Sequence, residues 1–540
     1  MAHSVGLQQR RQPGKASAGG GRECRARVLR PKLGIRPKRG GRERGRALEF
    51  PWQKHHPARR VQRRQRPGRT FPADASRIKS ESMKQHMTAD LNRRDFLRGG
   101  SAAAFFTMLG GVPILAAEEQ PGSAPTQYKG ETPPVKVGVI GCGAWGREIL
   151  KTLSTISFGP VVAICDNYPA YLKRGATLAP NAERFDDYTK LLASPEVEAV
   201  VVATPTHLHK EFVLAALAAG KHVYCEAPLA ASLEDTRAIA EAARKHIKLN
   251  FQPGLQARAD KQIVNLMKFV RTGVMGTSLK GRAQFHKKMS WRLASATPER
   301  EKALNWRLDS ATSCGLVGEF GVHQVDLANW VFNAPPTEVK GVGAVTFYKD
   351  GRDVFDNIQA LFRYPNGVHY SYEATVGNSF DGEMGMFFGS DCAIMMRERR
   401  AWMFKEADAP LLGWEVYAVK EAFYKESGIS LRAGASKQDA QKEAAKGPDV
   451  VDEKSALQYA LENFLINSHN LAAAVKDFAD SYGEGSEDDL REFLKEQAKR
   501  REPAAELLDG YLATVAVLKA NEAMVKGQPI AFAPEWFQLG

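Results

Sequence analysis

The hydrophobic pattern of the chain becomes regular at Val135 and remains so to about residue 252. Four apolar runs in this stretch have the length of buried strands: VKVGVI at 135–140, VVAIC at 161–165, AVVVA at 199–203 and KHVYC at 221–225. Segments of helical periodicity separate these runs, and a helix pattern at 234–245 and a strand pattern at 247–252 close the stretch. Strands that alternate with helices are typical of a parallel, doubly wound sheet, so we predict an α/β domain over residues 135–252.

The pattern changes after residue 253. Four stretches alternate or are rich in strand-forming residues: 278–288, 338–348, 357–364 and 368–375. Tyr364-Pro-Asn-Gly367 predicts a hairpin turn, and Gly389-Ser-Asp391 is a second turn candidate. Helices are predicted at about 458–480 and 503–526, whereas 432–457 is charged, poor in apolar residues and predicted to be an exposed insertion. We therefore predict a second, α+β domain over residues 253–540.

The positive charge of the chain is confined to its first part. Residues 1–98 contain 27 Lys and Arg against 7 Asp and Glu, a net charge of 27 − 7 = +20. The whole chain has a formal net charge of +15, so residues 99–540 are net negative. The folded part has no excess of positive charge, and we predict no nucleic-acid partner. Residues 1–90 have a composition that predicts disorder. Two interpretations stay open: an RNA-binding arm, or an extension upstream of a true start at Met83 or Met87, which we favour.

A targeting signal follows over residues 91–117. The pair Arg93-Arg94, within NRRDFLR, precedes the apolar run SAAAFFTMLGGVPILAA. A twin-arginine pair before a short apolar region is the signature of Tat export, although Asn92 stands where Ser or Thr is usual. The run is too short and too interrupted for a transmembrane helix. We therefore predict a periplasmic or exported protein without a stable membrane span unless the signal stays uncleaved, and a linker over residues 118–134.

The first readable chemistry lies in Gly141-Cys-Gly143-Ala-Trp-Gly146, between a predicted strand and a predicted helix. The first glycine permits a tight turn, the second lets the backbone approach a pyrophosphate, and the third allows close helix packing. The next strand ends in Asp166, 20 residues after Gly146, where an acid accepts hydrogen bonds from the adenosine ribose. Asn167 follows with no arginine beside it, which favours NAD over NADP. We predict that NAD binds to these residues: Gly141, Gly143, Ala144, Trp145, Gly146 and Asp166.

Together with motifs further along, this sequence resembles the Gfo/Idh/MocA family, the relatives of glucose-fructose oxidoreductase and inositol dehydrogenase. The matching stretches are VGVIGCGAWG, the strand end at Asp166, ATPTHLH, HVYCEAP, GLQARAD and GEFGVHQVD. The resemblance covers residues 135–395 well and 455–540 more loosely. It implies a Rossmann domain and then a C-terminal domain whose open, mostly antiparallel sheet covers the cofactor. We also predict a homo-oligomer through that sheet.

The resemblance also shows where the chain departs from the family. Most family dehydrogenases carry Glu-Lys-Pro after the strand at 221–225, and the lysine serves as an acid/base or orienting group near the nicotinamide. Here the triplet is Glu226-Ala227-Pro228, and alanine has no proton to give, so alcohol oxidation needs another base. Glu226 is a catalytic candidate at the nicotinamide end, with a purely structural role as the alternative. Four residues near these strand ends are predicted to line the cofactor: Thr204, Pro205, His209 and Glu226. Packing at a helix start is the alternative for His209.

A second group of candidates is Glu319-x-x-x-His323-x-x-Asp326. Spacings of four and three place these residues on one face of a helix. In the family, an Asp at the position of Glu319 and a His at the position of His323 form the catalytic pair, and imidazole suits proton removal from a sugar hydroxyl. We predict catalytic roles for His323 and Glu319. Asp326 is predicted to contact substrate, with structural pairing as the alternative.

Trp306 and Arg307 precede this motif. An aromatic ring and a guanidinium suit stacking against a sugar and clamping it, so we predict that both bind substrate; a core Trp with a surface Arg is the alternative. None of the six cysteines lies in a metal-ligand spacing, and we predict no metal site.

Three functions follow from these residues. The first is a periplasmic NAD-dependent oxidoreductase that acts on a sugar, polyol or derivative and recycles a tightly bound cofactor. The second is an NAD-dependent glycosidase, which some relatives with an apolar residue in place of the lysine exemplify; transient oxidation at C3 acidifies the C2 proton and allows elimination of the aglycone. The third is a non-catalytic, NAD-bound sugar-binding protein.

Overall fold

The structure is a computed structural model that describes residues 133–397, 400–410, 420–423, 426–431, 454–483 and 485–539. The predicted basic segment, the Tat signal and nearly all of the linker lie outside the described residues, as does 432–453 of the predicted insertion. Within the described ranges, no helix is long and apolar enough to cross a membrane.

The first domain contains a six-stranded sheet in the order β3-β2-β1-β4-β5-β6, and every neighbouring pair is parallel. Its strands are β1 (Val137–Ile140), β2 (Val161–Cys165), β3 (Glu183–Phe185), β4 (Ala199–Val202), β5 (His222–Cys225) and β6 (Phe251–Pro253). The connecting helices are α3 (Ala144–Leu153), α4 (Pro169–Ala176), α5 (Tyr188–Ala193), α6 (His209–Ala218) and α7 (Leu233–Lys245). All residues of β1, β4 and β5 are buried, as expected for a sheet with helices on both faces. The predicted doubly wound fold is confirmed.

The second domain contains a ten-stranded sheet in the order β14-β15-β13-β12-β11-β7-β10-β9-β8-β16. Its strands are β7 (Ser278–His286), β8 (Glu338–Ala344), β9 (Asn357–Arg363), β10 (His369–Thr375), β11 (Glu383–Gly389), β12 (Cys392–Arg397), β13 (Arg400–Lys405), β14 (Lys420–Phe423), β15 (Glu426–Leu431) and β16 (Ile530–Ala531). Only β7 and β10 pair in parallel among these strands, so the predicted mostly antiparallel sheet is confirmed. The predicted turn at 364–367 joins β9 to β10, with Asn366 in the left-handed region.

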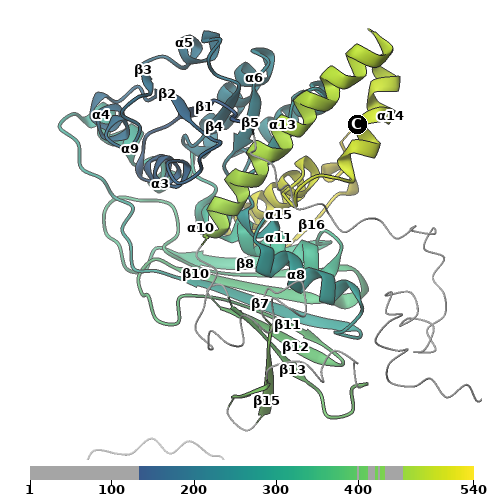
Figure 1. The fold of residues 1–540 in the computed structure, drawn as a ribbon. Coiled ribbons are helices and arrows are strands. Elements are labelled where there is room, and N and C mark those ends of the chain that lie inside the picture. The colour runs from purple at the N-terminus through teal and green to yellow at the C-terminus, as the bar shows by residue number, and fades with distance from the viewer. Residues whose placement is uncertain are drawn as a thin grey trace, which may run out of the picture. The chain divides into compact units, whose positions relative to one another are not determined.

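Helices from the C-terminal part of the chain join the two sheets (Figure 1). The helices of this part are α8 (Lys261–Arg271), α9 (Pro298–Leu304), α10 (Gly315–Glu319), α11 (Gly321–Phe332), α13 (Ala456–Tyr482), α14 (Glu487–Ala498) and α15 (Leu507–Lys526). Helices α11 and α15 pack on one face of the large sheet, and α15 also contacts α7 of the first domain. Leu461 and Phe464 of α13 share one buried core with Val137 and Ile149. The first domain is therefore completed by a helix that follows the second sheet in sequence.

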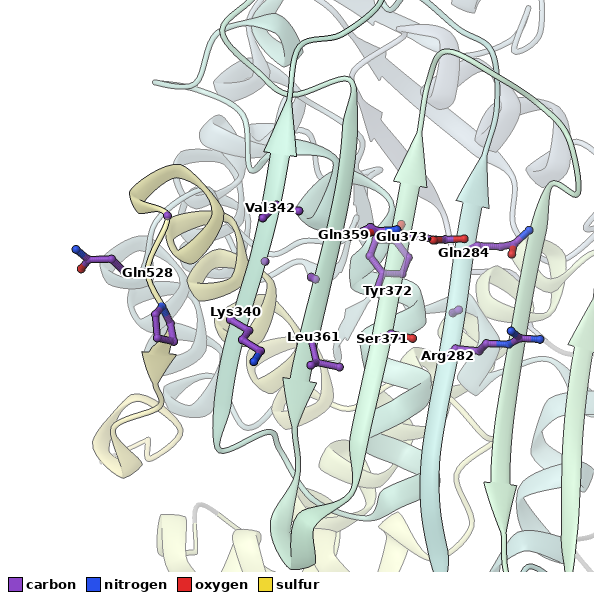
Figure 2. A pocket seen from close by; sticks show the side chains of 15 residues that line it. Arg282, Gln284, Lys340, Val342, Gln359, Leu361, Ser371, Tyr372, Glu373 and Gln528 are labelled. Atoms are coloured by element: carbon purple, nitrogen blue, oxygen red, sulfur yellow. Dashed lines mark hydrogen bonds between the residues drawn. The ribbon is translucent and has the colours of Figure 1, made fainter. Parts of the chain in front are cut away.

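The other face of the large sheet carries a groove with mixed lining. Figure 2 shows Lys340, Leu361, Ser371 and Arg282 on this face, on strands β8, β9, β10 and β7. Val342 on the same face is 67% exposed. None of the predicted site residues lines this groove. A homo-oligomer through this sheet stays a prediction.

Candidate cofactor and active site

The turn between β1 and α3 is crowded on one side and open on the other. Gly141 has a φ of +101°, and a Cβ there would lie 2.5 Å from the Ala203 carbonyl oxygen. A Cβ on Gly146 would lie 1.8 Å from the Gly141 oxygen, so both positions require glycine. A Cβ on Gly143 would meet no atom within 4 Å, and no side chain caps the N-terminus of α3. The free N–H groups of Ala144 and its neighbours therefore begin beside open space, which suits a phosphate.

Asp166 lies at this same turn because β2 ends beside β1. Its Oδ2 accepts a hydrogen bond from the Cys142 N–H at 2.8 Å, and its Oδ1 accepts one from the Tyr168 N–H at 2.8 Å. Burial raises the pKa of Asp166, although these two hydrogen bonds oppose the shift. The carboxylate is thus held at the end of the strand that carries the ribose acid in dinucleotide-binding folds.

Two buried polar atoms next to this turn have no hydrogen-bond partner among the described residues. They are the hydroxyl oxygen of Thr204, just after β4, and Oε1 of Glu226, just after β5. Buried polar groups are nearly always paired, so unpaired ones indicate a place for a ligand. Together with the open side of Gly143 and the fixed Asp166, they fit a dinucleotide. Bound NAD would supply a hydride acceptor here. Pro205 lies between Thr204 and Thr206, and the Thr206 hydroxyl bonds the Glu319 carboxylate.

Glu226 is linked to the glycine turn by Trp145, whose indole N–H donates to its carboxylate. Burial raises the pKa of Glu226 to about 7. A carboxyl group with this pKa can accept or donate a proton near neutral pH. Ala227 and a cis peptide to Pro228 follow, so the side chain after Glu226 offers no titratable group. Glu226 is therefore the titratable group that the triplet retains.

His209 supports the two loops that follow β4 and β5. Its Nε2 lies 3.0 Å from the Thr204 carbonyl oxygen and its Nδ1 lies 3.1 Å from that of Pro228. Burial lowers the pKa of His209 to about 4, so the ring is neutral near pH 7 and donates to one of the two carbonyls. Both ring nitrogens thus face backbone carbonyls and the side chain is 1% exposed, which favours the packing alternative, while the cofactor contact stays a prediction.

A polar cluster joins the second domain to the end of β4. The Arg307 Nε donates to Glu319 Oε2 at 3.3 Å, and the Thr206 hydroxyl also bonds the Glu319 carboxylate. Burial raises the pKa of Glu319, while Arg307 and the Cys314 N–H oppose the shift. The Arg307 guanidinium lies 4.3 Å from the centroid of the Trp306 ring. Thr206 was not among the predicted site residues, although it lies within the motif ATPTHLH.

The helix predicted to carry Glu319, His323 and Asp326 on one face is broken. Glu319 ends α10, Phe320 has φ −120° and ψ −43°, and α11 begins at Gly321. The prediction of one shared helix face is therefore wrong for Glu319. At the break, Phe320 stacks on Phe285 with 4.1 Å between the ring centroids, a packing contact that accompanies the non-helical backbone.

His323 lies in the first turn of α11 and is half-buried. Burial lowers the pKa of His323 to about 4. Its ring has no hydrogen bond or ion pair within the described part of the chain, so the imidazole is neutral near pH 7 and can accept a proton from a substrate. Burial thus reverses the ordinary order of these two groups: the pKa of the Glu226 carboxyl lies at about 7 and that of the His323 imidazole at about 4.

Asp326 points away from this cluster and pairs with Arg258. Both carboxylate oxygens accept from the guanidinium, at 2.8–3.1 Å, and Asp326 is 1% exposed. Arg258 also pairs with Asp509 on α15 at 2.9 Å. The predicted substrate contact of Asp326 is not what the structure shows: both oxygens of its carboxylate accept from Arg258, which in turn pairs with Asp509 of α15, and this corresponds to the structural alternative.

Comparison with known proteins agrees with this geometry. Residues 135–254 match the model of the Gfo/Idh/MocA oxidoreductase family with its NAD-binding Rossmann fold, and residues 263–394 match a Gfo/Idh/MocA C-terminal domain. An inositol 2-dehydrogenase of Acidothermus cellulolyticus is 32% identical over 243 residues, which is 45% of this chain and 66% of that protein. One of Salmonella typhimurium is 29% identical over 208 residues, 38% of this chain and 57% of its own length. The matches thus span less than two thirds of these relatives.

Solved structures show the same fold at lower identity. A levoglucosan dehydrogenase in complex with NADH and levoglucosan has a TM-score of 0.54 at 19% identity, and 74% of this chain covers 99% of it. An oxidoreductase domain protein from Kribbella flavida has a TM-score of 0.56 at 19% identity, with 74% and 100% covered.

In the part of the chain that the structure describes, the fold and the site define two domains, of which the first is an NAD-binding Rossmann domain. Over residues 135–254 and 263–394, the chain matches the two domain models of the Gfo/Idh/MocA oxidoreductases.

Proposed function

We propose that this chain is an NAD-dependent oxidoreductase that acts on a sugar, polyol or derivative and keeps its cofactor tightly bound. The observation that carries the proposal is the cluster of Arg307 and Glu319 on Thr206, just after β4, with Glu226 just after the neighbouring strand β5 and the open dinucleotide turn after β1. The Trp306 ring with Arg307 suits stacking on a pyranose. The names of the inositol 2-dehydrogenases and the levoglucosan dehydrogenase support the same substrate class.

The chain's own residues divide the remaining work. Arg307 and Trp306 hold and orient the substrate, and Glu226 and His323 are the groups free to take a proton from a hydroxyl. Mass spectrometry of the purified protein, followed by a carbohydrate panel read as NADH formation, tests the proposal. A protein that neither carries nor binds a dinucleotide would contradict it. Tight cofactor with no turnover on any carbohydrate would favour the non-catalytic sugar-binding protein instead.

A glycosidase is the second candidate, because Ala227 stands where the family's lysine is usual. Aryl glycosides separate the two reactions, since hydrolysis releases the aglycone without net formation of NADH. Replacing Ala227 with lysine provides an independent test.

If the native reaction is alcohol oxidation, Ala227→Lys should raise the dehydrogenase rate about tenfold, because a positioned acid/base contributes on the order of 10²-fold or more when its geometry is ideal. Ala227 is only half-buried, so the longer side chain has a path outward. Ala227→Met is the matched control for side-chain length without charge. A rate that falls equally in both variants, with aryl glycoside cleavage in the native protein, would favour the glycosidase.

We also propose export by the Tat pathway, which carries folded proteins with cofactor already bound. Replacing Arg93 and Arg94 with Lys should leave the full-length protein in the cytoplasm, as cell fractionation would show. The motif NRRDFLR before a short apolar run supports this expectation. Unchanged delivery to the periplasm would contradict it.

A further inference from the structure

An arginine from the second domain reaches the ribose end of the cofactor site. Arg300 lies on α9, far from Asp166 in sequence, and Figure 1 shows α9 beside α4. Its guanidinium lies 3.9 Å from the centroid of the Tyr168 ring, and its Nη1 lies 3.5 Å from Asn167 Oδ1. The sequence prediction that no arginine lies beside Asn167 holds along the chain but fails in space.

Arg300 and Asp166 both contact Tyr168. Tyr168, the ring under the guanidinium, donates its own N–H to Asp166 Oδ1. The charge of Arg300 also favours the ionised form of Asp166, against the effect of burial on its pKa. A second aromatic ring, Tyr171, lies edge-on to Tyr168 with centroids 5.0 Å apart. Arg300 therefore covers the loop that follows the ribose acid.

Arg300 has an N–H group that is unpaired in the described part of the chain, and the helix that carries it is held in place by contacts within the second domain. Its Nε is buried and has no hydrogen-bond partner among the described residues. The helix that carries it is fixed within the second domain: Thr297 caps α9, and Arg292 pairs with Glu301 at 2.6 Å. A planar guanidinium with unused N–H groups can stack on a base and bind ribose or phosphate oxygens.

We propose that Arg300 is a clamp by which the second domain holds the adenosine end of the dinucleotide and slows its release. This inference rests on the proposed use of NAD. The stacked guanidinium and its unused donors act on the adenosine, while Asp166 remains the group that selects the 2′-hydroxyl. Release of the cofactor then requires α9 to withdraw from α4.

The first test is the rate of NADH dissociation, measured by stopped-flow fluorescence on purified full-length protein without substrate. Arg300→Ala should release NADH about tenfold faster, the scale of one stacked cation–π contact in a partly desolvated site. Lys302→Ala on the same helix is the matched control, because Lys302 is an exposed cation and should leave the rate unchanged. Arg300→Lys keeps the charge without the planar donor array and should lie between the two.

A purely structural latch gives a different result. Arg300→Ala would then lower the melting temperature without cofactor, and the increase in melting temperature on adding NADH would equal that of the wild type. Equal NADH dissociation rates in Arg300→Ala and wild type would overturn the clamp and leave the proposed function intact. A wild-type chain that binds no NADH would instead overturn the proposed function.

The second test uses the 2′-phosphate as a probe. Asp166→Ser should weaken NADH binding and admit NADPH, because the carboxylate that repels the phosphate is gone. Arg300 is then the cation beside Asn167. The double variant Asp166→Ser with Arg300→Ala should therefore bind NADPH at least tenfold more weakly than Asp166→Ser alone. Equal NADPH affinity in the single and double variants would contradict a guanidinium that faces the adenosine.

Discussion

Turnover should fall about 10²-fold or more in His323→Ala while NAD remains bound, which is the usual scale for loss of a general base. The imidazole is half-buried, makes no hydrogen bond within the described residues and is neutral near pH 7 because burial lowers its pKa to about 4. It can therefore take a proton from a substrate hydroxyl without first losing one. Initial rates on the substrate found by the carbohydrate panel, with bound NAD measured in parallel, check this result.

The pH profile distinguishes His323 from Glu226. A base acts when deprotonated, so the rate falls as the pH drops through its pKa. With His323 as the base, the acid limb should lie near pH 4, whereas Glu226 would place it near pH 7. Glu319→Gln should cost less than His323→Ala, because Glu319 is already held by Arg307 and Thr206. Wild-type turnover in His323→Ala with cofactor bound would remove the imidazole from the mechanism.

Asp326→Ala should destabilise the protein by about 3 kcal/mol, because removing one partner of a buried ion pair leaves the remaining charge poorly compensated. The guanidinium of Arg258, which stacks 4.8 Å from the Trp330 ring, would keep only Asp509. Denaturant unfolding of the cofactor-free protein measures the loss as a lower midpoint.

Asp509→Ala is the matched control, since its side chain is 22% exposed against 1% for Asp326 and its loss should cost less. The two predicted roles of Asp326 give opposite results. If the Asp326→Ala variant unfolds at the wild-type midpoint but needs much more substrate to reach half its maximal rate, the result would support the predicted substrate contact of Asp326.

Elements of the fold could be predicted where their own residues carry the hydrophobic pattern. The buried runs at 137–140, 199–202 and 222–225 were predicted as strands because nearly all of their residues are apolar, and the alternating residues of β9 and β10 predicted that hairpin. Strand β3 was not predicted, because its residues Glu-Arg-Phe are largely exposed and show no strand pattern apart from their pairing with β2. Nor was α14 predicted, a mostly charged helix with one buried leucine.

The site was readable only as far as its residues are neighbours in sequence. The glycine turn and Asp166 follow a spacing that one strand and one helix impose. Three contacts of the site join residues that lie 68 or more positions apart, so no local pattern encodes them. They are the Arg258–Asp326 pair, the Thr206–Glu319 bond and the Arg300–Asn167 contact. The shift of pKa at Glu226 likewise depends on burial by segments distant in sequence.

The shared core of α13 and the first sheet sets the order in which the chain can mature during synthesis. When β6 leaves the ribosome, every strand of the first sheet exists, but Leu461 and Phe464 are still about 200 residues from being made. The apolar face formed by Val137 and Ile149 stays uncovered until then. The first domain therefore reaches its final packing only near the end of translation.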